Sequence, residues 1–145
     1  MPAQPLTRKQ INVSAADRVR IPTEIAAYAR AHYATPVNRE SMGRKYNLPG
    51  WKIGQLFEAI HETTLHHYVR QLRLEQACRL LLMDLKIDGI ATDVGYQSKK
   101  NFYRAFKAVF NMRPGEWRRQ QHERQAQRTV SPRPSDDQST RDATD

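Results

Sequence analysis

The sequence predicts an all-α fold in which two similar helical lobes are joined by one long helix. Apolar residues recur at the spacing of amphipathic helices, and no stretch shows the alternation of a half-buried strand. The pattern of one helix-forming segment recurs 49 positions later in the chain. Between the two copies, an uninterrupted helical stretch runs from Leu65 to about Met83, with apolar side chains on both of its sides.

The first half of the chain is expected to form three helices behind a flexible arm at residues 1–20. The first helix is expected to begin at Pro22, because proline fits the first turn of a helix. Asn38 is expected to cap the second, which is short. These helices are expected at about residues 22–33, 38–46 and 49–61.

In the second half, Thr63 or Thr64 is expected to cap the long helix, and Ser98 to cap a later one. The short helix between them ends at a turn at Gly95, and a last helix begins at Pro114. The predicted domain covers residues 21–120: a first lobe at about 21–63, the linker helix at about 64–83, and a second lobe at about 84–120. Residues 121–145 are polar and lack aromatic side chains, so they are predicted to be a disordered tail.

Matching helical faces define the repeat. In the earlier helix, an apolar side carries Ile53 and Phe57, and their counterparts 49 positions on are Phe102 and Phe106. The outward-facing positions correspond in the same way, since Arg104 lies 49 positions after Gln55. The predicted unit is a short helix, a turn and a second helix with one apolar face and one exposed face, which is the arrangement of a helix-turn-helix.

The segment Ile87-x-x-Ile90-Ala91-x-x-Val94-Gly95-Tyr96 gives the clearest turn signature. Ala91 permits close packing of the two helices, and Gly95 can take the left-handed conformation that ends a helix. The whole stretch IDGIATDVGYQSKKNFYRAFKAVFNMRPGEWRR resembles the second half of the AraC/XylS-type DNA-binding domain. A long helix containing Tyr68, Arg73 and Ala77 resembles that family's linker, and the resemblance covers about residues 22–120.

The resemblance implies a homeodomain-like, duplicated fold whose two recognition helices enter adjacent major-groove segments of double-stranded DNA. It also implies which side chains meet the DNA. The implied base contacts are Trp51, Lys52 and Gln55 in the first lobe and Lys99, Lys100 and Arg104 in the second. The implied phosphate contacts are Ser98, Lys107, Arg113 and Arg118.

The first lobe departs from the family pattern at three positions. Glu62 stands in place of the usual turn glycine, Gly54 lies inside the reading helix, and Glu58 replaces a lysine. Residues 38–62 carry a net charge of +1, whereas residues 86–110 carry +3. Since phosphate neutralisation supplies much of the affinity for DNA, the second lobe is expected to dominate binding.

Bulk composition agrees with an anionic partner. The 145-residue chain has a net charge of +9 and a pI of about 10.1, and residues 121–145 contribute −1 of that charge. It has one cysteine, Cys78, no secretory leader and no apolar run near the ~18 residues that span a bilayer, so a cytoplasmic, nucleoid-associated protein with no membrane association is expected.

Catalysis and metal binding are not predicted. No nucleophile–base pair and no phosphate-cradling glycine loop is evident, so the chain is not expected to be an enzyme or to need a cofactor. The string HETTLHH departs from the zinc-binding pattern His-Glu-x-x-His, because Leu65 takes the fifth position.

The prediction is a sequence-specific transcriptional regulator without a ligand-sensing domain, bound to DNA as a monomer. Two alternatives stay open at this point. One is a protein-interaction module that docks on RNA polymerase or another regulator. The other is a non-specific architectural DNA binder.

Overall fold

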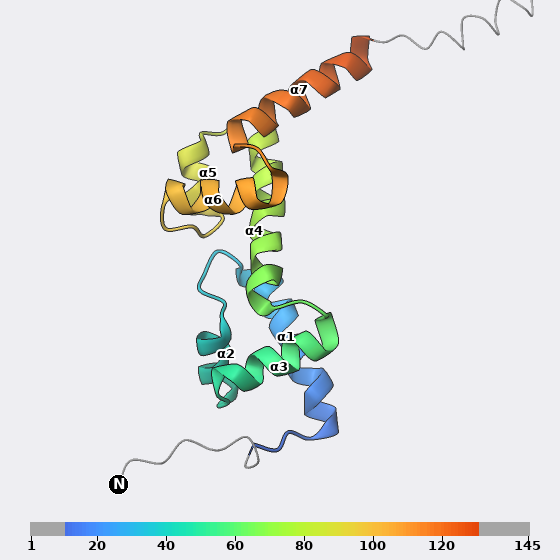
Figure 1. Ribbon diagram of the computed structural model, residues 1–145, viewed down its shortest axis with the longest axis vertical. Coiled ribbons are helices and arrows are strands. Elements are labelled where there is room, and N and C mark those ends of the chain that lie inside the picture. The colour runs from blue at the N-terminus through green and yellow to red at the C-terminus, as the bar shows by residue number, and fades with distance from the viewer. Residues whose placement is uncertain (1–10, 131–145) are drawn as a thin grey trace, which may run out of the picture.

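The computed structural model describes residues 11–130, and within this range every regular element is a helix (Figure 1). The all-α prediction is therefore confirmed. The helices are α1 Ala15–His32, α2 Arg39–Tyr46, α3 Gly50–His61, α4 Leu65–Leu82, α5 Ile87–Asp93, α6 Lys99–Phe110 and α7 Pro114–Val130. None of these helices has the length and apolar character needed to cross a membrane.

Helix α1 begins at Ala15, seven residues before the expected start, so the prediction of a flexible arm is wrong for residues 15–20. Ser14 caps the helix, because its side chain accepts a hydrogen bond of 3.1 Å from the backbone N–H of Asp17. Pro22 lies inside the helix, where it removes one backbone hydrogen bond but is itself buried. Ile11 and Val13 are buried too, ahead of the cap, and residues 1–10 of the predicted arm lie outside the described residues.

The last helix continues to Val130, so the prediction of a disordered tail is wrong for residues 121–130. This stretch carries Glu, Arg, Gln and Ala, which are good helix formers, and the next helix breaker is Pro132. The expectation for residues 131–145 lies outside the described part of the chain.

The predicted duplication is confirmed by the helix boundaries. Helix α6 begins and ends 49 positions after α3, and each has 12 residues. The helices also end alike, since Glu62 and Asn111 both take the left-handed conformation at the C-cap, with φ of 58° and 57°. The helix that follows each copy, α4 or α7, begins three residues after this C-cap.

Two separate hydrophobic cores underlie the two lobes. The first gathers buried residues of α1, α2 and α3 with the beginning of α4, and Ile25, Ile53 and Phe57 are fully buried in it. The second gathers α5 and α6 with the later part of α4, and Phe102 and Phe106 are fully buried in it. Helix α4 serves both cores and stands between the lobes in Figure 1, as the sequence predicted.

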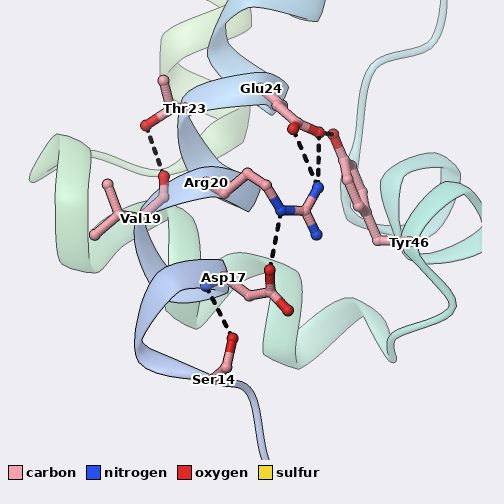
Figure 2. A network of polar contacts seen from close by, with 7 residues as sticks. All are labelled: Ser14, Asp17, Val19, Arg20, Thr23, Glu24 and Tyr46. Carbon is pink, nitrogen blue, oxygen red and sulfur yellow. Dashed lines mark hydrogen bonds and ion pairs between the residues drawn. The ribbon is translucent and has the colours of Figure 1, made fainter.

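A polar network on the surface of the first lobe joins α1 to α2 (Figure 2). Arg20 pairs with Asp17 at 2.9 Å and with Glu24 at 3.1 Å, both within α1. The hydroxyl of Tyr46, the last residue of α2, donates to Oε1 of Glu24 at 3.0 Å. This bond fixes the end of α2, immediately before the turn that leads into α3.

Candidate nucleic-acid interface

Helix α6 presents one apolar face to the second core and one basic face to solvent. Its start is fixed by Ser98, whose side chain accepts from the backbone N–H of Asn101 at 3.1 Å. Three turns then place Lys100, Arg104 and Lys107 on the exposed side. The spacing puts these cations on one side of a helix that its phenylalanines anchor.

Lys99 belongs to the same group but has a partner inside the protein. Its Nζ atom lies 3.1 Å from Oδ1 of Asp88 on α5, and 5.4 Å from the centre of the Tyr103 ring. The hydrogen bond to Asp88 raises the pKa of Lys99. Lys99 is half exposed, so the ion pair lies at the surface.

Helix α3 offers a different surface. Lys52 is buried, with 9% of its surface exposed, and its Nζ donates to Oε1 of Gln55 at 2.8 Å. Trp51 is half-buried and packs against the first core, with the Lys52 ammonium 6.0 Å from the centre of its ring. Gln55 is therefore exposed to solvent, but its side-chain oxygen already accepts a hydrogen bond from Lys52.

Arg39, the first residue of α2, also lies at the surface of α3, and no pattern in the sequence indicated it. A Cβ atom placed on Gly54 would lie 3.0 Å from Cδ of Arg39, and one placed on Gly50 would lie 3.4 Å from its Cβ. The exposed arginine therefore lies along a strip of α3 that two glycines leave bare. The glycine pair in α3 was visible in the sequence, but the contact with α2 depends on the tertiary fold.

The remaining predicted phosphate contacts lie after α6. Arg113 is exposed in the turn between α6 and α7. Arg118 on α7 donates from Nη1 to the backbone carbonyl of Leu85 at 2.7 Å, so it ties α7 to the connection between α4 and α5. The structure thus collects Ser98, Lys99, Lys100, Arg104 and Lys107 on α6, places Trp51, Lys52 and Gln55 on α3, and gives Arg118 a contact within the protein.

Side chains suited to metal binding do not gather within residues 11–130, where no group of three or more His, Cys, Asp or Glu could hold an ion. Burial raises the pKa of the Cys78 thiol to about 11. The thiol is therefore protonated at neutral pH and packs against the second core as a small apolar group.

Comparison with known proteins agrees with this architecture. The profile of a helix-turn-helix domain family matches residues 42–120. The regulatory protein SoxS of Escherichia coli K12 is 30% identical over 100 residues, covering 68% of this chain and 94% of SoxS. The regulator AlkR of Acinetobacter baylyi is 38% identical over 96 residues, covering 65% of this chain and 31% of AlkR.

Solved structures show the same fold. The C-terminal domain of the response regulator AraT from Geobacillus stearothermophilus superposes with a TM-score of 0.66 at 26% identity, covering 69% of this chain and 84% of that one. The DNA-binding domain of AdpA, solved with a target DNA, superposes with a TM-score of 0.67 at 20% identity, covering 73% and 96%.

Two helix-turn-helix units at the ends of one helix define a class of DNA-binding domain. The chain belongs to the AraC family of DNA-binding transcription regulators. The family and fold are those of regulators rather than enzymes.

Proposed function

We propose that this protein binds a specific sequence of duplex DNA by placing α3 and α6 in two adjacent major-groove segments. The observation that carries the proposal is the equivalence of these two helices. They have the same length, their starts and ends both lie 49 positions apart, and their C-caps have the same left-handed conformation. In Figure 1 they lie across the long axis of the molecule, α3 near the start of α4 and α6 beside its later half, and both run in the same sense.

The length of α4 suits this role. Its 18 residues span about 27 Å at 1.5 Å per residue. Major-groove segments on one face of B-DNA recur at about 34 Å, which is of the same order as the length of α4. Because one chain supplies both units, a monomer covers both segments.

The second unit supplies most of the affinity in this proposal. Lys100, Arg104 and Lys107 are exposed on α6, whereas the one lysine of α3 is buried and bonded within the helix. In this proposal Arg104 reads base edges and Lys107 neutralises a phosphate. In the first unit, Gln55 and Arg39 supply the polar groups.

Relatives support the assignment to transcription. The AraT chain is described as part of a response regulator, and the AdpA domain was solved on a target DNA. By this analogy the protein acts on chromosomal DNA in the cytoplasm.

The proposal is tested by selecting bound sequences from a random duplex library and footprinting the best site. We expect two half-motifs on one face of the DNA, within one continuous footprint. A flat sequence preference would instead indicate an architectural binder. A footprint of a single helical turn would contradict reading by both units.

Point variants then rank the two units on the selected site. Arg104→Ala is expected to lose about tenfold or more in affinity, since a good base contact contributes about 1–3 kcal/mol. Gln55→Ala is expected to lose less, because the amide is already engaged by Lys52. Equal losses at one salt concentration would contradict the dominance of the second unit.

A further inference from the structure

Within residues 11–130, the two lobes also meet where the connection between α1 and α2 reaches the second lobe. There Tyr33 packs against the second core. At the turn between α5 and α6, a Cβ atom placed on Gly95 would lie 2.8 Å from Cα and 2.9 Å from the carbonyl oxygen of Ala34. The two connections therefore touch backbone to backbone, and a side chain at position 95 would push them apart.

Arg73 joins the three segments that meet there. From the middle of α4, its Nε donates to the carbonyl of Tyr33 at 2.7 Å and its Nη2 to the carbonyl of Thr35 at 3.1 Å. Its guanidinium carbon lies 5.3 Å from the centre of the Tyr96 ring, in the turn of the second lobe. One side chain therefore contacts the linker helix, the first lobe and the second lobe.

The surroundings of Arg73 suit an arginine in particular. The guanidinium is half-buried, burial lowers its pKa, and no carboxylate within residues 11–130 forms an ion pair with it. Its charge is instead balanced by carbonyls at the C-terminal end of α1, where the helix dipole is negative, and by the face of the Tyr96 ring. A lysine would not span two carbonyls with a planar fork.

The position of Arg73 along α4 explains why this contact matters. Val69 belongs to the first core and Leu74 to the second, so Arg73 stands where the helix passes from one lobe to the other. The cores do not share a buried residue. Without the contact at Arg73, bending or twisting of α4 would change the angle between α3 and α6.

We propose that Arg73 is a positioning residue that fixes the angle between the two lobes, and thereby the spacing of the two DNA half-sites that one chain accepts. The inference rests on the proposed reading of DNA by both units. One added base pair moves a half-site by about 3.4 Å and rotates it by about 34°. If the contacts of Arg73 hold the two lobes at a fixed angle, the protein cannot bind both half-sites at the new spacing. If the angle is free to change, it can.

The angle between the lobes is tested without DNA. Cysteines are placed at the exposed positions Ala59 of α3 and Ala108 of α6, in a Cys78→Ala background, and carry spin labels. The distance between the labels is measured by pulsed electron paramagnetic resonance. We expect a single narrow distribution that Arg73→Met broadens. Arg79→Met is the matched control, because Arg79 lies on the same helix and, within residues 11–130, its hydrogen bond is to Gln76 of that helix.

The consequence for DNA is tested by repeating the random-library selection with Arg73→Met. We expect the variant to recover the same half-motifs at more than one spacing. For a site lengthened by one base pair, we expect the loss of affinity to be about tenfold in the parent protein and about twofold in the variant. Should Arg73→Met fail to fold, Arg73→Lys keeps the charge and most of the stem and is expected to act in the same direction.

Two results would overturn the inference. One is an unchanged label distribution in Arg73→Met and Arg73→Lys. The other is a uniform loss of affinity at every spacing, which would make Arg73 a source of charge or stability only. If the parent protein itself selected a single half-motif, the proposed function would fail, while the label measurement would still decide whether Arg73 holds the lobes.

Discussion

The ammonium of Lys99, the first residue of α6, lies 3.1 Å from a carboxylate oxygen of Asp88 on α5. The pair joins the two helices of the second helix-turn-helix unit at the edge of its proposed DNA surface. If α6 binds DNA as proposed, Lys99 must share its charge between Asp88 and a DNA phosphate or base. Asp88 also adds a negative charge close to this proposed surface.

Replacing Asp88 by asparagine is therefore expected to strengthen DNA binding. The gain should be about two- to fivefold at low salt and should shrink as salt rises, because an exposed ion pair is weak and salt screens it. Fluorescence anisotropy titrations at two salt concentrations measure it. Asp93→Asn, at the end of the same helix, is the control for a general loss of negative charge. Equal gains from both variants would contradict a specific role of the Lys99 pair.

Arg39 is expected to contribute to DNA binding although it lies outside the recognition helices. Its exposed side chain lies along α3 over Gly50 and Gly54. We expect Arg39→Ala to lose about tenfold in affinity, the size of one good charged contact. Arg44→Ala, an exposed arginine at the other end of α2, is the matched control and should lose less.

Gly54→Ala separates binding from stability at this place. A Cβ at position 54 would press against Cδ of Arg39 at 3.0 Å and displace the arginine. The same change removes a glycine from the interior of a helix, which stabilises the fold by about 0.5–1 kcal/mol. We therefore expect a higher melting temperature together with weaker DNA binding. Weaker binding with a lower melting temperature would show damage to the lobe instead.

Much of this arrangement was predictable from the sequence, because it depends on local pattern. The repeat at 49 positions followed from the apolar faces around Phe57 and Phe106, and both phenylalanines are fully buried, whereas Ile60 and Val109 near the ends of the two helices are exposed. The family resemblance implied a base contact for Lys52, but its long apolar stem is buried and its ammonium bonds within the helix. Contacts such as those of Arg73 and Arg39 join segments that only the tertiary fold brings together, so no local pattern indicates them.

The early start of α1 has a similar explanation. Proline is common in the first turn of helices, and this preference favoured a start at Pro22. The burial of Ile21, Pro22 and Ile25 outweighs the one hydrogen bond that proline removes from the helix interior. Serine is a favoured N-cap residue, and Ser14 takes that position in α1, whereas a start at Pro22 would have left Ile21 there.

The equivalence of Glu62 and Asn111 predicts a stabilising substitution. Both residues hold left-handed backbone at the end of a recognition helix, with φ of 58° and 57°, but asparagine tolerates this conformation better than glutamate. Glu62→Asn is expected to raise the free energy of unfolding by about 0.5–1 kcal/mol, near the lower end of the cost of such strain. Urea unfolding measures the change. Glu62→Gln removes the charge but keeps the strained backbone, so an equal gain from glutamine would assign the effect to charge.

Tyr46 predicts how stability depends on alkaline pH. Burial, together with the hydrogen bond to Glu24, raises the pKa of Tyr46 to about 12. The folded protein therefore binds the phenolic proton more tightly than the unfolded chain, whose tyrosine has its ordinary pKa of 10.0. This contribution is complete below pH 10 and is lost as the pH rises from about 10 to about 12.

Tyr46→Phe removes that contribution and is tested by thermal unfolding across the same pH range. At neutral pH the variant should be less stable by about 1 kcal/mol, the usual net contribution of a hydrogen bond. Its melting temperature should then fall less steeply than that of the parent between pH 10 and pH 12, so that the two curves converge. Tyr28→Phe is the control. Tyr28 lies on the facing helix α1, and its ring centre lies 3.8 Å from the Lys45 ammonium. If the melting temperatures of Tyr46→Phe and the parent instead fell in parallel, the Tyr46 hydroxyl would titrate equally in the folded and unfolded states. The hydrogen bond to Glu24 would then contribute nothing to the loss of stability at alkaline pH.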